Sequence, residues 1–484
     1  MKTAIVIGAG IGGLASAIRL QRKGYKTTVL EANAYPGGKL TSLNLGKYRF
    51  DAGPSLFTLP NLIEDLFPNK AEFDKHFPFV KLDRSCHYFW NDGTEFKAWF
   101  KKDQLEKEIS QVLDVPSAPF IKKLEKSKFQ YETLSELFLE QSLHLFKTYL
   151  SKATFKAITR IPKLELFSSM NDSNKKLNHP KLAQLFNRYA TYNGSNPYQA
   201  PGVLNMIPHL EYNVGTFFPK NGMVQIRESL VKLAEESGVE ILLNTPVSEI
   251  KHNELGTTGV VSSQGLHKTN LVVCNADIHQ AYSKLLPRVK PPNTQKDQEA
   301  SSSALIFYWG IKKTFAQLHL HNLFFADNYE QEFKCIFETG EQHPDPSIYI
   351  NITSKLNPKD APKNKENWFV MINVPSSISG LTQKDIAQAK SNIIRKLNRQ
   401  LKCNLEDLIE EEDHLSPQLI QSKTGSHMGA LYGSSSNNQN SAFLRHPNFH
   451  SKIKGLYFAG GSVHPGGGIP LCLLSAKIIE DLVD

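Results

Sequence analysis

Three glycines and one acidic residue near the N-terminus have the spacing of a nucleotide-binding turn. Gly8, Gly10 and Gly13 follow an apolar, β-branched run at residues 3–7 and open a segment whose apolar residues recur at helical spacing. Glu31 comes eighteen residues after Gly13, at the end of a second expected strand at residues 27–30. In such a unit the glycines allow a tight turn and close approach to a pyrophosphate, and the acid binds both hydroxyls of a ribose. The sequence therefore predicts a dinucleotide site on a strand, turn and helix.

A second glycine-rich loop lies at the far end of the chain. The segment GLYFAGGSVHPGGGIPLCLLSAK predicts a strand at residues 456–459, a glycine-dense loop and an apolar helix from Leu471. Between the two ends, AYPGGKL predicts a loop whose amides are free to face a ligand, with Lys39 beside it, although a surface turn with a solvated lysine fits these residues equally well. Two such units are what a large two-part cofactor requires, since each helix N-terminus attracts negative charge.

Length and composition favour a globular protein of two domains. The chain has 484 residues, of which 40% are hydrophobic and 21% charged, and its formal net charge is +9. A positive net charge favours binding to nucleic acid or to an anionic membrane surface, and the composition does not distinguish these two partners. The five cysteines are scattered without metal-ligand spacing, so we expect a reduced, cytoplasmic protein without a metal site. We expect no signal peptide, because the first residues run directly into a strand, and no apolar run reaches the roughly 18 residues of a bilayer span.

Residues 141–170 form an amphipathic, basic segment within a helical, glycine-poor region. Apolar residues such as Phe146, Leu150 and Phe155 are interleaved with four lysines and one arginine, and Glu165 is the one acid. Such a segment can lie in a membrane interface, with its apolar side among acyl chains and its lysines on headgroups. It can equally be a packed helical lid with a solvated basic face. The residues alone leave both interpretations open.

Several stretches together resemble the carotenoid desaturases, of the phytoene desaturase type and its hydroxycarotenoid relatives. They are GAGIGGLASAIRL with VLEANAYPGGKL, FDAGPS, EYNVGTFFPKNGM, DPSIYINITSKLNPKDAP and YFAGGSVHPGGGIPLCLLSAK, and they span essentially the whole chain. The resemblance implies an FAD enzyme with a discontinuous flavin domain that acts on a long, apolar polyene taken from the bilayer. It therefore favours the membrane interpretation of residues 141–170.

The same resemblance implies which residues contact the flavin. By that analogy the adenosine and pyrophosphate side is lined by Gly8, Gly10, Gly12, Gly13, Glu31, Lys39 and Ser55, with the Val247 backbone near the adenine. The ribityl chain and the isoalloxazine ring would lie along Gly460, Gly461, Gly468 and Ile469. Related flavoproteins often carry an acid after the first glycine of this loop, whereas here Gly461 and Ser462 follow Gly460. Backbone amides or Ser462 would then make the contacts at that point.

The remaining chain alternates between two structural types. Residues 206–277 predict a helix at 223–237 and strands at 240–243, from Val247 and at 271–274 that rejoin the nucleotide sheet. Residues 278–415 carry aromatic and β-branched runs that predict a mostly antiparallel sheet, followed by a helix at 385–401. We therefore expect an α/β fold with a discontinuous, Rossmann-type FAD-binding domain at 1–84, 206–277 and 416–484. Residues 85–205 and 278–415 would form an α+β substrate domain with an antiparallel sheet and a helical, membrane-facing region.

Two residues are candidates for the proton transfer that accompanies flavin desaturation. Such an enzyme removes two hydrogens from adjacent carbons, one as a hydride to the flavin and one as a proton or through charge delocalised on the polyene. The candidates are Glu211, in the HLEY stretch, and His464, in the loop expected to abut the ring. An ion-paired or helix-capping carboxylate and a loop-fixing histidine are alternative roles for them. Arg49 and Asp51 are expected to form a buried structural pair.

We therefore expect a cytoplasmic, peripherally membrane-associated, FAD-dependent carotenoid desaturase with oxygen or a quinone as electron acceptor. Within the family, 3,4-desaturation of a hydroxycarotenoid is favoured over multi-step desaturation of phytoene. A carotenoid isomerase or saturase on the same scaffold and a flavin-bound carotenoid carrier are the alternatives. Nucleic-acid binding is not expected, because the positive residues are spread along the chain and no recognition module is evident.

Overall fold

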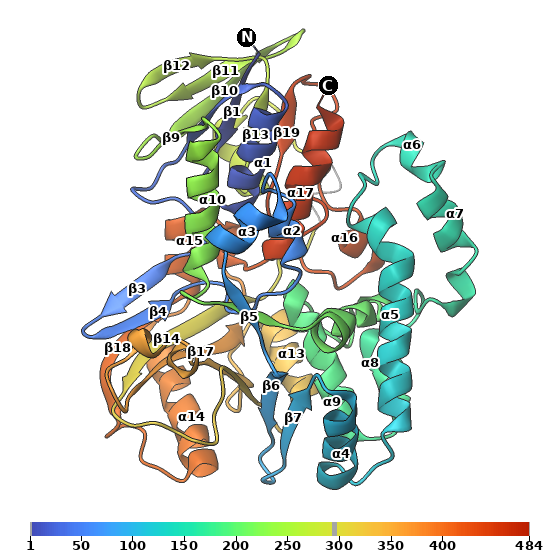
Figure 1. The fold of residues 1–484 in the computed structure, drawn as a ribbon, viewed down its shortest axis with the longest axis vertical. Coiled ribbons are helices and arrows are strands. Elements are labelled where there is room, and N and C mark those ends of the chain that lie inside the picture. Colours follow the sequence, from blue (N-terminus) through green and yellow to red (C-terminus); the bar gives the residue numbers. More distant parts are fainter. Residues whose placement is uncertain (1, 293–297, 484) are drawn as a thin grey trace.

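The first layer of the molecule is a five-stranded parallel sheet. The computed structural model describes residues 2–292 and 298–483, and in it the strand order of this sheet is β19-β13-β1-β2-β9. The strands are β1 (Thr3–Ile7), β2 (Lys26–Leu30), β9 (Glu240–Leu242), β13 (Val272–Cys274) and β19 (Leu456–Phe458). Figure 1 shows both chain ends beside this sheet. The sheet thus joins three distant segments of the sequence.

Three helices pack together on this sheet. They are α1 (Ile11–Arg22), α10 (Val224–Glu236) and α17 (Ile469–Leu482), and α1 contacts both of the others. A Cβ built on Gly13 would lie 2.1 Å from the carbonyl oxygen of Gly8, so α1 approaches the end of β1 more closely than any side chain allows. The predicted strand at 3–7, helix at 223–237 and C-terminal helix are confirmed, with small differences at their ends.

The expectation that the strand from Val247 rejoins the parallel sheet is wrong. β10 (Val247–Asn253) pairs with β11 (Gly256–Ser262), and β11 pairs with β12 (Gly265–Lys268), in a separate antiparallel sheet. Only residues 254 and 255 separate β10 from β11. A connection of this length makes a hairpin, whereas a parallel strand needs a crossover of a dozen or more residues. The strands predicted at 240–243 and 271–274 do enter the parallel sheet, as β9 and β13.

The second layer is a seven-stranded, mostly antiparallel sheet in the order β18-β14-β17-β16-β15-β6-β7. Its strands are β6 (Arg84–Phe89), β7 (Glu95–Trp99), β14 (Ser303–Ile311), β15 (His321–Phe324), β16 (Ile348–Asn351), β17 (Glu366–Val374) and β18 (Ile409–Leu415). Side chains of β14 alternate between two faces. Leu305, Phe307 and Trp309 share a core with α14 (Gln383–Leu401), while Ile306 and Tyr308 line the cavity described below. The antiparallel sheet predicted in residues 278–415 is confirmed, and β6 and β7 join it from an earlier part of the chain.

Helices dominate residues 102–187. They are α4 (Lys102–Val112), α5 (Ala118–Phe138), α6 (Phe146–Tyr149), α7 (Lys152–Ile158), α8 (Met170–Lys175) and α9 (Pro180–Asn187). The amphipathic segment is broken between α6 and α7, where the Ser151 side chain accepts a hydrogen bond from the Thr154 amide and caps α7. Figure 1 shows α6 and α7 on the outer side of α5, at the edge of the molecule. Throughout residues 2–292 and 298–483, none of the helices has the length and hydropathy that crossing a membrane requires.

Shorter elements connect these layers. They are β3 (Ser42–Leu45), β4 (Tyr48–Asp51), β5 (Phe79–Lys81), β8 (Phe217–Pro219), α2 (Asn61–Glu64), α3 (Lys70–His76), α11 (Ile278–Gln280), α13 (Tyr329–Lys334), α15 (Pro417–Thr424) and α16 (Gln439–Phe443). The β3–β4 hairpin follows the first βαβ unit and reaches the seven-stranded sheet, where Tyr48 and Phe50 pack with Tyr308 and Phe369. This contact holds the two layers in register around the cavity.

Candidate active site

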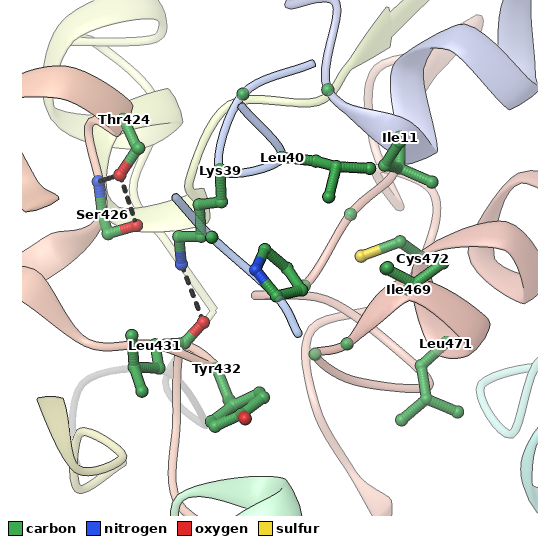
Figure 2. A pocket seen from close by; sticks show the side chains of 18 of the residues that line it. Ile11, Lys39, Leu40, Thr424, Ser426, Leu431, Tyr432, Ile469, Leu471 and Cys472 are labelled. Atoms are coloured by element: carbon green, nitrogen blue, oxygen red, sulfur yellow. Dashed lines mark hydrogen bonds between the residues drawn. The ribbon is translucent and has the colours of Figure 1, made fainter. Parts of the chain in front are cut away.

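One large cavity receives residues from both layers. Its volume is about 1200 Å³, and its wall consists of loops of the parallel sheet, one face of the seven-stranded sheet and part of the helical region. Ligand pockets usually measure roughly 300–1,000 Å³, so this cavity has room for a dinucleotide together with a second molecule. Figure 2 shows Ile11 and Ile469, the first residues of α1 and α17, on the same part of the wall. The two ends of the chain therefore face one cavity.

The N-terminal turn presents its backbone to the cavity. Gly8, Gly10 and Gly12 line it, and Gly10 is the N-cap of α1, where no side chain of the described residues makes a capping hydrogen bond. This helix N-terminus offers N–H groups and the positive end of the helix dipole to an anion. Glu31 lies beside the turn, and its carboxylate accepts a hydrogen bond from the Ala9 amide at 2.7 Å. The glycine turn and Glu31 therefore have the arrangement that binding of a dinucleotide requires.

The C-terminal loop faces the same cavity from α17. Gly468 is the N-cap of α17, and again no described side chain caps the helix. The Ser462 Oγ accepts a hydrogen bond from the Ile278 amide at 2.9 Å, which ties the loop to α11 and leaves the hydroxyl hydrogen for a ligand. Two uncapped helix N-termini that open on one cavity fit a flavin dinucleotide, which carries negative charge at its pyrophosphate.

Lys39 is a half-buried cation in the cavity wall. Its Nζ donates a hydrogen bond to the carbonyl oxygen of Leu431 at 2.7 Å (Figure 2). It donates a second one to the carbonyl oxygen of Ala430 at 3.2 Å. Burial lowers the pKa of Lys39. The residue therefore joins the N-terminal part of the wall to the segment that leads into the C-terminal loop.

The cavity brings together nearly all of the predicted cofactor residues. Gly13 is the exception, because it lies behind the turn, against Gly8, and not among the described residues that line the cavity. Its role is the close packing of α1 on β1. The predicted residues that line the cavity are Gly8, Gly10, Gly12, Glu31, Lys39, Ser55, Val247, Gly460, Gly461, Ser462, Gly468 and Ile469.

Glu211 lines the cavity as one half of a buried ion pair. The Nη2 of Arg188 lies 2.9 Å from each carboxylate oxygen, and the Tyr189 hydroxyl donates to Oε2 at 2.6 Å. Burial by itself lowers the pKa of Arg188, but the facing carboxylate outweighs burial and raises this pKa well above its usual value. A carboxylate has about four lone-pair positions, so three accepted hydrogen bonds leave room for one more. Glu211 thus stays our candidate base.

His464 does not have the position that the sequence suggested. Among the described residues it is absent from the cavity lining, although the next residue, Pro465, is part of it. The Nε2 of His464 lies 2.9 Å from the carbonyl oxygen of Gln141, and burial lowers the pKa of His464 to about 4. A neutral imidazole therefore donates to this carbonyl and ties the glycine loop to the segment that precedes α6. The geometry gives His464 the alternative role, that of fixing the loop.

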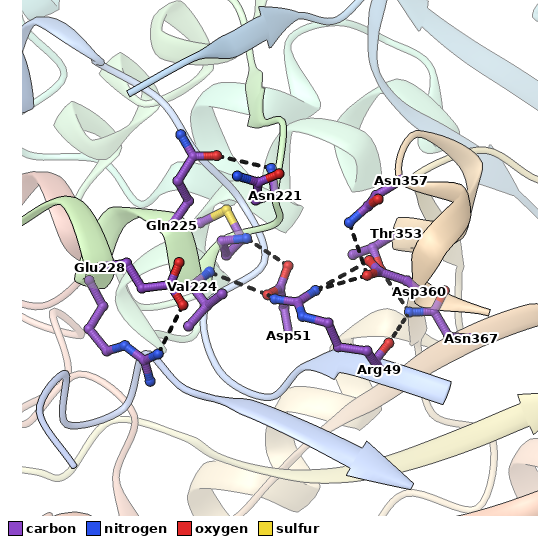
Figure 3. Close-up of polar contacts among 12 residues, drawn as sticks. Arg49, Asp51, Asn221, Val224, Gln225, Glu228, Thr353, Asn357, Asp360 and Asn367 are labelled. Carbon is purple, nitrogen blue, oxygen red and sulfur yellow. Dashed lines mark hydrogen bonds and ion pairs between the residues drawn. The ribbon is translucent and has the colours of Figure 1, made fainter. Parts of the chain in front are cut away.

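Arg49 and Asp51 form the expected buried pair outside the cavity lining. Arg49 Nη2 lies 2.7 Å from Asp51, and Arg49 Nη1 lies 3.2 Å from Asp360. Figure 3 shows that Asp51 also accepts hydrogen bonds from the amides of Met223, at 2.7 Å, and Val224, at 3.3 Å. The carboxylate thereby satisfies the N-terminus of α10, and the arginine connects this helix to the turn that contains Asp360. This is a structural role.

Three polar residues of the seven-stranded sheet were not predicted. Ser85, His321 and Tyr349 all line the cavity, and the Tyr349 hydroxyl lies 2.9 Å from the Ser55 Oγ and 2.7 Å from His321 Nδ1. Each comes from a different strand, and no local motif marks any of them. Only the pairing of β6, β15 and β16 brings them together.

A parallel nucleotide-binding sheet whose cavity continues along an apolar antiparallel sheet defines a flavoprotein oxidoreductase. The family model described as flavin containing amine oxidoreductase matches residues 11–478. The chain belongs to this family. The expected mixed α/β fold, the flavin cofactor and the assignment as an FAD-dependent oxidoreductase are thereby confirmed.

Individual proteins with similar sequences include carotenoid desaturases. The chain is 50% identical to a 1-hydroxycarotenoid 3,4-desaturase of Flavobacterium sp. (strain P99-3), over 100% of this chain and 99% of the relative. It is 30% identical to a phytoene desaturase of Fusarium fujikuroi, over 100% of this chain and 89% of the relative. The crystal structure of an oxidoreductase from Methanosarcina mazei superposes with a TM-score of 0.63 at 16% identity and covers 99% of this chain and 100% of its own. The resemblance to carotenoid desaturases is confirmed.

Proposed function

We propose that this protein is an FAD-dependent carotenoid desaturase that introduces the 3,4 double bond into a hydroxycarotenoid. The observation that carries the proposal is the single cavity, in which the glycine loops of the dinucleotide site and the apolar face of the seven-stranded sheet meet. A long polyene needs such an apolar wall directly beside its oxidant. The 50% identity to a 1-hydroxycarotenoid 3,4-desaturase along the whole chain supports the choice of substrate.

The reaction removes one hydrogen from each of two adjacent carbons. FAD, when bound, supplies the two-electron acceptor that takes the hydride. The side chains of the cavity hold the polyene in place and exclude water, and Glu211 is positioned to accept the proton. Arg188 and Tyr189 fix the orientation of its carboxylate through three hydrogen bonds. We propose oxygen or a quinone as the final electron acceptor.

We also propose that the protein takes its substrate from a membrane surface. Apolar side chains of the segment 146–167 are strongly exposed, with 79% of Phe146, 72% of Phe155 and 89% of Phe167 accessible. A soluble surface rarely exposes so many large apolar residues within one short segment. We call this group the apolar patch: Phe146, Tyr149, Leu150, Phe155, Ile158, Ile161 and Phe167.

The surroundings of the apolar patch support a lipid partner. The exposed Lys147, Lys152 and Lys163 lie in the same segment, where they suit anionic headgroups. The one acid of the segment, Glu165, is buried and paired with Lys126 at 2.6 Å and Lys123 at 3.6 Å. The exposed charge of this segment is therefore positive.

The apolar patch adjoins the cavity wall. Behind it, Ala153 and Ala157 of α7 share a core with Leu134 of α5, and Leu134 and Phe138 line the cavity. The ring of Phe138 lies 4.6 Å from that of Phe443 in α16, which also lines the cavity. An apolar substrate that leaves the bilayer at the apolar patch would pass this aromatic pair to reach the cavity.

The proposed domain division follows the same lines. Residues 1–84, 206–277 and 416–484 supply all the strands of the parallel sheet and the helices α1, α10 and α17. Residues 85–205 and 278–415 supply the helical region and nearly all of the seven-stranded sheet. The cavity lies where the two sets of residues meet.

The test is a reconstituted assay with the FAD-loaded protein. A 1-hydroxylated acyclic carotenoid in phospholipid vesicles, with a quinone or oxygen, is expected to yield a product that is two hydrogens lighter and absorbs at longer wavelength. Release of a colourless or unchanged carotenoid would overturn the proposal. A product formed from phytoene and not from the hydroxycarotenoid would favour the multi-step phytoene desaturase, and a product of unchanged mass would favour an isomerase.

A further inference from the structure

Three buried polar atoms of cavity-lining residues have no hydrogen-bond partner among the described residues. One is the Nε of Arg188, whose Nη2 is paired with Glu211. The other two lie on the seven-stranded sheet and are the Oγ of Ser85 and the Nε2 of His321. Ser85 is 1% and His321 3% exposed, and both residues line the cavity. The same sheet contributes apolar residues to the wall, among them Leu323, Phe369 and Met371, and the charge of Arg188 is near enough to His321 to lower its pKa. Buried polar groups are usually paired, so an unpaired donor and an unpaired hydroxyl in an apolar cavity call for a ligand.

The hydrogen bonds of His321 define which ring nitrogen carries its proton. Asn351 Nδ2 donates to His321 Nδ1 at 3.2 Å, because an amide nitrogen is only a donor. The Tyr349 hydroxyl approaches the same Nδ1 at 2.7 Å. Burial lowers the pKa of His321 to about 3, so the ring is neutral near physiological pH. The proton is therefore on Nε2, which is a donor that lacks an acceptor.

Ser85 reaches the cavity because β6 contains a bulge. Arg84 pairs with Trp99 of β7, but the next pair is His87 with Lys97, so β6 has one extra residue in this interval. A bulge changes the alternation of side chains, and the consecutive residues Ser85 and Cys86 both line the cavity. β15 runs parallel to β6 with Asn322 opposite His87. This register sets His321 next to the bulge.

A chain of hydrogen bonds connects His321 to Ser55, a predicted contact on the adenosine and pyrophosphate side of the cofactor. The Ser55 Oγ, one of the predicted flavin-contacting groups, lies 2.9 Å from the Tyr349 hydroxyl, which lies 2.7 Å from His321 Nδ1. The reacting bond of a 3,4-desaturase must lie beside the flavin. In a substrate hydroxylated at C1 only C2 separates the hydroxyl-bearing carbon from C3. The group that recognises the hydroxyl must therefore lie in the same cavity as the cofactor, as His321 and Ser85 do.

We propose that His321 and Ser85 form the binding subsite for the substrate hydroxyl and so determine specificity for hydroxylated carotenoids. His321 Nε2–H donates to the hydroxyl oxygen, and the hydroxyl hydrogen is donated to Ser85 Oγ. This inference rests on the proposed function. A polyene without the hydroxyl would leave both groups unpaired in an apolar cavity, and a site built to bind a hydroxyl rejects such an analogue strongly.

The experiment compares kcat/KM for a 1-hydroxylated acyclic carotenoid and for the same polyene without the hydroxyl. Wild-type FAD-loaded protein is expected to prefer the hydroxylated substrate by about 100-fold or more. His321→Phe and Ser85→Ala are each expected to lower this ratio by about tenfold or more, through a loss on the hydroxylated substrate alone. Ser85→Ala, the smaller change, decides the outcome if His321→Phe fails to bind FAD.

His87→Phe is the matched control. His87 is a buried histidine of the neighbouring strand, burial lowers its pKa to about 3, and it lies outside the described cavity lining. Its substitution is expected to leave the preference unchanged. An unaltered ratio in Ser85→Ala and in a folded His321→Phe would overturn the inference while leaving the desaturase activity in place. Absence of any new double bond in either substrate with the wild-type protein would instead be the failure of the proposed function.

Discussion

Gly12 and Gly460, separated by most of the chain, lie in direct contact at the flavin site. A Cβ on Gly12 would stand 3.0 Å from the Gly460 amide nitrogen and 2.8 Å from Asn275 Oδ1. The N-terminal turn and the C-terminal loop therefore meet through bare backbone. The contact with Gly460 is with backbone, and the Asn275 side chain is held by its hydrogen bond to the Gly8 carbonyl oxygen, so little in this region can move to accept a larger residue.

Gly12→Val is accordingly expected to abolish FAD binding, measured as the flavin absorbance that copurifies with the protein. Gly24→Ala is the control, because a Cβ there meets nothing within 4 Å. Gly24 has a φ of +84°, so the alanine is expected to lower the free energy of unfolding by about 1–2 kcal/mol and to retain the flavin. Full flavin content in Gly12→Val would contradict the close approach of the two loops.

The second prediction concerns the buried ion pair between Arg188 and Glu211. Glu211→Gln leaves a buried guanidinium without its charge partner, so the free energy of unfolding is expected to fall by about 3–5 kcal/mol. If Glu211 also accepts the substrate proton, kcat falls by about 10²-fold or more at a temperature where the variant is folded. Glu132→Gln breaks the exposed contact with Lys128 and is expected to cost less than about 1 kcal/mol. Chemical denaturation and single-turnover flavin reduction measure the two effects, and an unchanged kcat would remove Glu211 as the base.

Buried histidines make the protein sensitive to acid. Burial lowers the pKa of His446 and of His464 to about 4 each, whereas an unfolded histidine titrates near pH 6.5. Between these values the unfolded chain binds more protons than the native one, so stability falls as pH is lowered through this window. Each such residue contributes a slope of about 1.4 kcal/mol per pH unit. His446→Gln is expected to reduce the slope measured by denaturant unfolding between about pH 6 and pH 4.5, and an unchanged slope would refute the assignment.

The apolar patch predicts binding to lipid. Phe146→Ser, Phe155→Ser and Phe167→Ser combined are expected to reduce cosedimentation with anionic phospholipid vesicles by about tenfold per residue. The matched control replaces Leu255, Leu266 and Ile378 by serine, since these apolar residues are also exposed but lie elsewhere in the sequence. This control is expected to bind vesicles like the wild type. Equal losses in both triple variants would show that the apolar patch has no special role.

The sequence allowed the nucleotide-binding half of the site to be predicted because its signals are local. The spacing of Gly8, Gly10 and Gly13 and the acid at Glu31 follow from one turn and two strands, and each is readable within thirty residues. The far loop at Gly460 was recognised for the same reason. The two loops were assigned to one site because a large two-part cofactor requires two such units, and the resemblance to a family supported this assignment.

The substrate half of the site could not be predicted from local sequence patterns. His321 and Ser85 come from β15 and β6, and their meeting depends on the strand order of the sheet and on one bulge. Neither leaves a pattern in the sequence around either residue. His464 was misplaced for a related reason, since a glycine-rich loop can direct a side chain either into the cavity or toward Gln141, and only the fold decides.

The edge strand β19, at residues 456–458, also bears on how the protein is made. The parallel sheet takes its first strand from residues 3–7 and its last from residues 456–458, so more than 450 residues must emerge from the ribosome before the sheet is complete. The C-terminal glycine loop can therefore complete the cofactor site only after β19 has been synthesised. Chains that stop before β19 would display unfinished apolar surface and become substrates for chaperones and proteases.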